Sequence, residues 1–140
     1  KDQDKNDTTL SSFKGRRVIL SFYPAAFTGV CTNQACTVND AMSSLSSSDC
    51  DVIGISVDAP FSNKAFADAN GITYPLLSDV HREVITAYGV TFDDFAIKGY
   101  TVAQRSVFVV EADGTIGYAW YSENPGMEPD YEALFAHIGV

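Results

Sequence analysis

Val18-Ile19-Leu20-Ser21-Phe22-Tyr23 is a continuous apolar stretch rich in β-branched and aromatic residues, and it lies between Arg16-Arg17 and Pro24. A run of this composition and length predicts a strand that is buried on both faces. We take it as the first central strand of the fold. The rest of the chain is organised around it.

Strands and helices alternate after this first strand. Helices are predicted for residues 29–45, where apolar side chains recur at helical spacing, and for residues 60–70, which Gly71 terminates. Between them, residues 51–58 form a second apolar run that predicts another buried strand. Alternation of strand and helix implies parallel pairing.

The sequence signal for secondary structure is weaker in the segments that follow. Residues 74–77 predict a short strand interrupted by Pro75, and Asp79 can cap a helix that extends to Tyr88. Residues 91–104 show no clear period, which predicts a surface insertion.

The end of the chain predicts antiparallel pairing. Residues 106–110 and 115–121 flank Ala112-Asp113-Gly114 as a hairpin, and residues 130–138 form a closing amphipathic helix. The order βαβαβαββα predicts one α/β domain over residues 1–140, in which a mixed central sheet is flanked by helices on both faces in a thioredoxin-like arrangement.

Composition excludes several classes of function. The chain has 140 residues with 46% hydrophobic content, which is enough for a real core and excludes a disordered protein. Its net charge of -9 repels phosphate backbones and anionic lipid, so nucleic-acid and membrane roles are disfavoured. No apolar run approaches a membrane span and residues 1–7 lack the apolar stretch of a signal peptide, so we expect a soluble cytoplasmic protein.

The three cysteines indicate chemistry more than cross-linking, because an odd number is poorly suited to a disulfide scaffold. Cys31 falls at the junction of the first strand and the first helix, where catalytic groups of α/β sheets often lie. The positive end of the helix dipole favours a thiolate there. Position alone leaves open that Cys31 is an inert packed residue.

The segment around Cys31 resembles the active-site segment of the peroxiredoxins, in which a proline, three residues, a threonine, two residues and a cysteine follow one another. Pro24, Thr28 and Cys31 reproduce that motif. The chain is still more similar to the bacterioferritin-comigratory group, and further matches follow in the family's order. These matches are Phe27-Thr28, Cys31-Thr32 with Cys36, residues 54–58, 75–79, 88–90 and 105–110, and Asp113-Gly114.

The resemblance implies a thiol peroxidase that reduces hydrogen peroxide and organic hydroperoxides. Cys31 would be the nucleophile and form a sulfenic acid, and Thr28 would hydrogen-bond the thiolate and the peroxide. Pro24 would shield the thiolate from water, and Arg105 would favour the ionised thiol and orient the substrate. Taken singly, Thr28 is better explained as a helix cap or turn hydroxyl and Arg105 as a solvated charge at the start of a strand, and Pro24 merely marks the end of a strand.

Cys36 is the candidate resolving cysteine. On an intact helix its Cα atom would lie about 8 to 9 Å from that of Cys31, whereas a disulfide requires less than about 7 Å. Either the two thiols never pair or the first turns of the helix must unwind. The resemblance favours unwinding, an intramolecular disulfide, and reduction by thioredoxin or a similar dithiol protein.

Two alternatives stay open from the residues: a one-cysteine peroxidase recycled by an external thiol, and a non-catalytic thioredoxin-like redox sensor. No cofactor and no metal is expected, because His81 and His137 belong to no ligand-spaced cluster. The protein is expected to be a monomer or a homodimer.

The chain departs from the family in two places. Gln34 stands where this group commonly carries an acid, and the N-terminal strand or hairpin that the family usually shows is expected to be missing. Cys50 matches no family motif, which favours a packing role.

Overall fold

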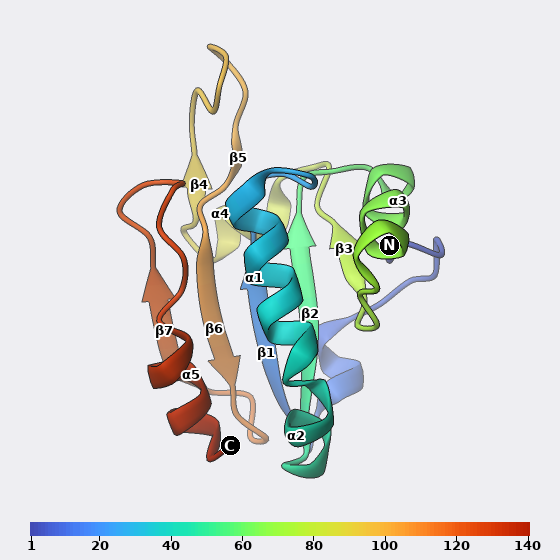
Figure 1. The fold of residues 1–140 in the computed structure, drawn as a ribbon, viewed down its shortest axis with the longest axis vertical. Helices are drawn as coiled ribbons and strands as arrows, with labels where there is room; N and C mark the ends of the chain where they lie inside the picture. The colour runs from blue at the N-terminus through green and yellow to red at the C-terminus, as the bar shows by residue number, and fades with distance from the viewer.

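A five-stranded mixed sheet runs through the molecule in the order β3-β2-β1-β6-β7, as the computed structural model of residues 1–140 shows (Figure 1). The central strand β1 (Arg17–Phe22) pairs in parallel with β2 (Cys50–Ser56) and antiparallel with β6 (Ser106–Val110). At the edges, β3 (Leu76–Ser78) is parallel to β2, and β7 (Ile116–Tyr121) is antiparallel to β6. The predicted mixed sheet is confirmed.

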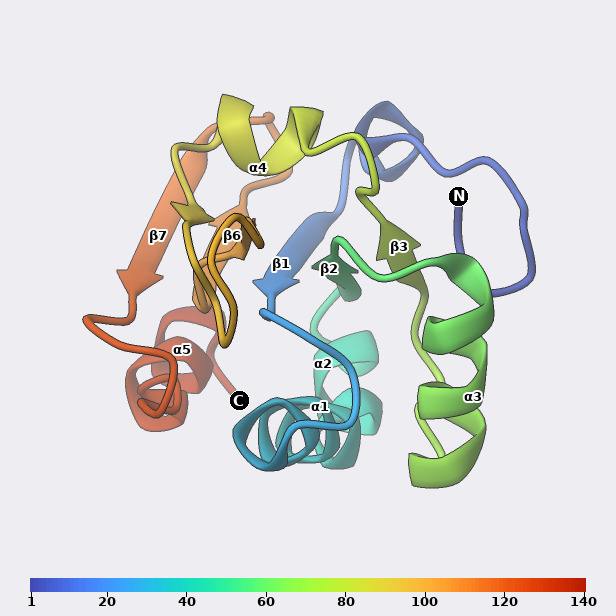
Figure 2. The ribbon, with the colours of Figure 1, turned by 90° about the horizontal axis from the view of Figure 1, so that it is seen from above.

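Four helices cover one face of this sheet, as seen from above in Figure 2. They are α1 (Gly29–Asp40), α2 (Met42–Ser47), α3 (Pro60–Asn70) and α5 (Tyr131–Ile138). Their apolar sides and one face of the sheet share a core of 17 buried residues. Cys31 is part of this core.

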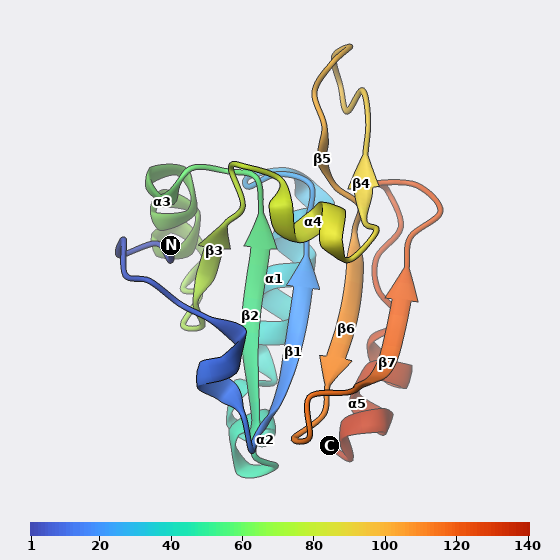
Figure 3. The same ribbon diagram turned by 180° about the vertical axis from the view of Figure 1, so that it is seen from behind.

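The opposite face, which Figure 3 shows, is covered by the short helix α4 (Glu83–Ala87) and the 3-10 turn η1 (Leu10–Phe13). A second core of 12 buried residues lies beneath them. The ribbon formed by β4 (Thr91–Phe92) and β5 (Val102–Ala103) packs on this core at its base and projects beyond the sheet (Figure 1). The expected helices on both faces are therefore confirmed.

The predicted helix over residues 29–45 is in fact two helices. At Ala41 the backbone N–H bonds to the carbonyl of Val38, three residues back, so the turn tightens, α1 ends at Asp40 and α2 begins at Met42. Val38 and Leu45 are nevertheless both buried on the same side of the sheet. Amphipathic spacing alone does not reveal such a break, because both pieces keep their apolar side toward one core.

The structure also differs from the prediction in the segment between α3 and β6. The strand expected over residues 74–77 occupies 76–78, because Pro75 has no N–H and contributes only its carbonyl, which accepts from Gly54. The helix expected from Asp79 starts at Glu83, although the Asp79 carboxylate still accepts the N–H groups of Val84 and Ile85. The insertion over 91–104 contains the β4–β5 ribbon.

None of the helices combines the length and the apolar composition that a membrane crossing requires.

Candidate active site

Cys31 lies in the first turn of α1, directly after the loop that leaves the end of β1. The backbone N–H groups of a first turn have no acceptor within the helix, so they place partial positive charge near the sulfur. The residue is 1% exposed. The predicted location at a strand-to-helix junction is therefore correct, and the thiol is enclosed by protein.

Arg105 lies between β5 and β6, and its side chain extends to the sulfur of Cys31. Its Nη2 donates a hydrogen bond of 3.1 Å to the sulfur of Cys31, and the side chain is buried. The interpretation of Arg105 as a solvated charge at a strand start is therefore wrong. The buried guanidinium thus supplies a charged hydrogen-bond donor beside the sulfur.

The other partners of this guanidinium are neutral. Nη1 donates to the side-chain oxygen of Gln34 at 2.7 Å, and Nε and Nη2 donate to the carbonyl of Pro125 at 3.2 and 2.9 Å. No carboxylate lies within ion-pair distance of Arg105. The Cys31 thiol is consequently the one ionisable group among its hydrogen-bond partners.

Gln34 is itself fixed from behind. Its amide nitrogen donates to the hydroxyl of Ser21 at 2.7 Å and to the carbonyl of Phe22 at 3.2 Å, both on β1. These two bonds settle which amide atom faces the guanidinium, so the oxygen must point to Arg105. The side chain of Gln34 thus links the central strand β1 to Arg105.

Pro24 and Thr28 line the loop before α1. Pro24 is buried at the end of β1, and Thr28 is half-buried at the N-cap position of the helix. The Thr28 hydroxyl donates to the carbonyl of Ala25 at 3.0 Å and makes no hydrogen bond to the sulfur of Cys31. Pro24 and Thr28 thus precede Cys31 closely in the sequence, but neither side chain bonds to its sulfur. Of the predicted site residues, only Arg105 makes a hydrogen bond to the sulfur.

Comparison with known proteins assigns the chain to a family. The family model described as the AhpC/TSA family matches residues 1–119. The chain belongs to this family. A Mycobacterium tuberculosis protein named as a peroxiredoxin is 46% identical over 123 residues, which cover 86% of this chain and 78% of that protein. Peroxiredoxin Bcp of Escherichia coli K12 is 38% identical over 120 residues, covering 85% of this chain and 77% of that one.

Solved structures of this family are also similar to the chain. The crystal structure of peroxidoxin BcpB from M. tuberculosis superposes with a TM-score of 0.86 at 30% sequence identity, covering 98% of this chain and 88% of that chain. The peroxiredoxin fold and the recognised family are thereby confirmed. Peroxiredoxins are thiol peroxidases, so this peroxiredoxin is an enzyme of that class.

The loop that carries Pro24 and Thr28 in this peroxiredoxin is tied to the end of β2. The carboxylate of Asp58 accepts the backbone N–H of Ala26 at 2.8 Å and the hydroxyl of Ser56 at 2.8 Å. Next to it, the buried hydroxyl of Tyr23 donates to Asn63 on α3 at 2.7 Å. These bonds hold the loop and the end of β1 to β2 and α3.

Cys36 lies on the same helix as Cys31 and is half-buried. All three cysteines are free thiols. Because α1 is continuous from Gly29 to Asp40, the two sulfurs sit on different faces of one helix about 1.4 turns apart. In this reduced form the peroxiredoxin does not bring Cys36 to Cys31.

Cys50 is remote from the site. The pairing of β1 with β2 places it opposite Arg17, at the start of β1, whereas Cys31 follows the other end, so a strand length of about 20 Å separates them. Burial raises the pKa of the Cys50 thiol to about 11. The packing role expected from the sequence agrees with this position.

Two partners of Arg105 had no assigned role in the sequence. Gln34 is three residues from Cys31 on one helix, and this spacing places both side chains on the same face, so it was detectable. Pro125 contributes a main-chain carbonyl from a loop far along the chain. No side-chain pattern signals such a contact.

Proposed function

We propose that Cys31 is the peroxidatic nucleophile of this peroxiredoxin, acting on hydrogen peroxide and organic hydroperoxides. Its thiolate attacks one peroxide oxygen, the O–O bond breaks, and the sulfur becomes a sulfenic acid. The second oxygen takes up a proton and leaves as water or an alcohol. The observation that carries the proposal is the 3.1 Å contact between the Arg105 guanidinium and the Cys31 sulfur, in a site without a competing carboxylate.

Arg105 has a second part in this scheme. Negative charge develops on the leaving oxygen as the O–O bond breaks, and a fixed guanidinium beside the sulfur can stabilise it without rearranging. Its planar fork can hold the sulfur and a peroxide oxygen on adjacent N–H groups, which a lysine cannot do. Arg105 therefore serves both the thiolate and the leaving oxygen.

Thr28 and Pro24 complete the proposed site. The Thr28 hydroxyl, held by Ala25 in the free enzyme, turns about χ1 to hydrogen-bond the bound peroxide. Pro24 is buried and offers no N–H to the site, so it keeps bulk water from the thiolate without adding a competing donor.

Cys36 is the proposed resolving residue. Its thiol condenses with the Cys31 sulfenic acid, releasing water and forming a disulfide, and a thioredoxin-type dithiol then reduces that disulfide. The first turns of α1 must unwind for this step, since an intact helix holds the Cα atoms about 8 to 9 Å apart. The distance of Cys50 along the sheet supports Cys36 over Cys50 as the resolving thiol.

Peroxide titration with thiol counting tests the scheme. We expect one equivalent of peroxide to remove two thiols from the wild type and to give a Cys31–Cys36 disulfide in the mass spectrum. Cys36→Ser should lose one thiol per peroxide and yield Cys31 sulfenate, and the control Cys50→Ser should match the wild type. Recovery of sulfenate alone from the wild type would overturn the resolving role and leave a one-cysteine peroxidase.

The cytoplasmic location and the monomeric or homodimeric state stay predictions.

A further inference from the structure

The guanidinium of Arg105 is held by a main-chain group as well as by Gln34. The carbonyl of Pro125 accepts two of its hydrogen bonds, from Nε at 3.2 Å and from Nη2 at 2.9 Å. Nη2 is the same nitrogen that donates to the sulfur of Cys31. The direction in which Nη2 of Arg105 points therefore depends on the position of the Pro125 carbonyl.

Pro125 belongs to the loop over residues 122–130, which rises past the end of β7 and returns to α5 (Figure 1). Within it, the side-chain oxygen of Asn124 accepts the N–H of Gly126 at 2.9 Å, and the Asn124 carbonyl accepts the N–H of Met127 at 3.2 Å. These bonds close a turn with proline at its second position, where the fixed φ of proline is favoured. The turn is thus held by its own residues in one conformation.

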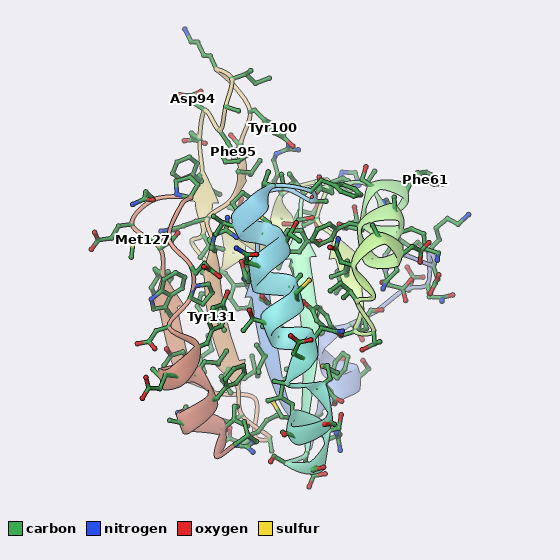
Figure 4. The ribbon with its side chains drawn as sticks, in the orientation of Figure 1. Phe61, Asp94, Phe95, Tyr100, Met127 and Tyr131 are labelled. Atoms are coloured by element: carbon green, nitrogen blue, oxygen red, sulfur yellow. The ribbon has the colours of Figure 1, made fainter.

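The loop is also tied to the segment that carries Arg105, directly before β6. The N–H of Ser122 donates to the carbonyl of Arg105 at 2.9 Å, and the side chain of Gln104 donates to the carbonyl of Ser122 at 2.7 Å. At its far end, the Tyr131 hydroxyl donates to Glu128 at 3.0 Å. Figure 4 shows Met127 on the outer side of this loop and Tyr131 where α5 begins.

A carbonyl suits this position because it is neutral. It satisfies two N–H groups of a buried cation, which are costly to leave unpaired, yet it does not cancel the positive charge that the thiolate needs. A carboxylate at the same place would compete with the thiolate for the guanidinium. The loop can therefore orient Arg105 without weakening its effect on Cys31.

We propose that the turn formed by residues 124–127 is a positioning element of the active site, which aims Nη2 of Arg105 at the sulfur and so sets the ionised fraction and the reactivity of Cys31. This inference rests on the proposed function. It assigns Asn124 as a positioning residue that acts through the Pro125 carbonyl and Arg105, without touching the substrate.

Asn124→Ala tests the proposal, measured in a Cys36→Ser, Cys50→Ser background so that Cys31 is the only thiol. The readouts are the pH profile of Cys31 alkylation by iodoacetamide and the single-turnover rate with hydrogen peroxide. We expect the alkylation midpoint to move to higher pH and the peroxide rate to fall about 3- to 10-fold, the effect of one weakened hydrogen bond. Asn124→Ser retains an acceptor for the turn and should recover most of the wild-type behaviour.

A matched control comes from the β6–β7 turn. Asp113 accepts the N–H of Thr115 at 3.0 Å with its carboxylate, which is the same kind of bond at a distance from the site. Asp113→Ala should leave the pH profile and the peroxide rate unchanged.

Arg105→Ala separates this inference from the proposed function. If Arg105→Ala shifts the profile and Asn124→Ala does not, the positioning role of the turn is wrong while the site stands. If neither variant shifts it, the proposed role of Arg105 is wrong as well, and the inference falls with it.

Discussion

Arg105 donates a hydrogen bond of 3.1 Å to the sulfur of Cys31, although 74 positions separate the two residues in the chain. The contact exists because β1 and β6 are neighbours in the sheet, so the segment that precedes β6 lies next to the end of β1. Both side chains are buried. No ion pair joins this arginine to an acidic side chain, so the Cys31 sulfur is the one ionisable group that it contacts.

Replacing Arg105 should slow peroxide reduction strongly. Arg105→Ala removes both the contact to the thiolate and the donor for the leaving oxygen, so we expect the single-turnover rate to fall about 100-fold or more, as for loss of an oxyanion donor. Arg105→Lys should recover only part of the rate, because a lysine keeps the charge but not the planar fork. Stopped-flow kinetics measure this effect, and a wild-type rate in Arg105→Ala would remove the residue from the site.

Changing Gln34 to Glu should make the ionised form of Cys31 less favourable. The new carboxylate would lie beside the guanidinium, where Gln34 now accepts at 2.7 Å, and its negative charge would disfavour ionisation of Cys31. The midpoint of Cys31 alkylation is therefore expected at higher pH in Gln34→Glu. Asn33→Asp adds the same charge at the exposed neighbouring position and should have little effect. An unchanged midpoint in Gln34→Glu would contradict the charge argument.

Cys50 should make the protein less stable in alkaline solution. Burial raises the pKa of its thiol from 9.0 to about 11, so the unfolded chain releases this proton at lower pH than the folded one. The free energy of unfolding should consequently fall between about pH 9 and pH 11, by up to about 1.4 kcal/mol per pH unit from this group. Urea denaturation at several pH values tests the effect, with Cys50→Ala as the reference. Parallel pH profiles for the two proteins would show that the thiol does not contribute.

Asp58 should matter for both stability and activity. Its carboxylate holds the N–H of Ala26, so Asp58→Ala leaves the active-site loop without its anchor and should cost about 1 to 3 kcal/mol of unfolding free energy. The peroxide rate should fall as the loop loosens. Asp94 accepts the N–H of Gly99 at the exposed end of the β4–β5 ribbon, where Figure 4 labels it, and Asp94→Ala is the control. Equal effects of the two substitutions on the rate would argue against the anchoring role.

The fold was predictable where patterns are local. The buried run of β1, the second strand and the hairpin around Asp113 each carry their own signal, and their order defines the sheet. The break at Ala41 was missed because the helical spacing continues across it. The ribbon over 91–104 was also missed, because its two strands have only two residues each.

The candidate site was predictable in part for the same reason. Pro24, Thr28 and Cys31 form one short motif, and Arg105 entered through the family resemblance. Burial of Arg105 is a consequence of tertiary packing, so the residues alone also allowed a solvated charge. The roles of Gln34 and of the Pro125 carbonyl depend on the orientation of the guanidinium, which only the assembled sheet and loop define.

The central claim, that Cys31 is the nucleophile, is tested most directly by the single-turnover rate of hydrogen peroxide consumption in the wild type, Cys31→Ser and Cys50→Ser. We predict rapid consumption by the wild type and by Cys50→Ser, far above that of free cysteine, and consumption no faster than background by Cys31→Ser. Wild-type consumption by Cys31→Ser would contradict the account, and a wild-type rate no greater than that of free cysteine would favour a redox sensor.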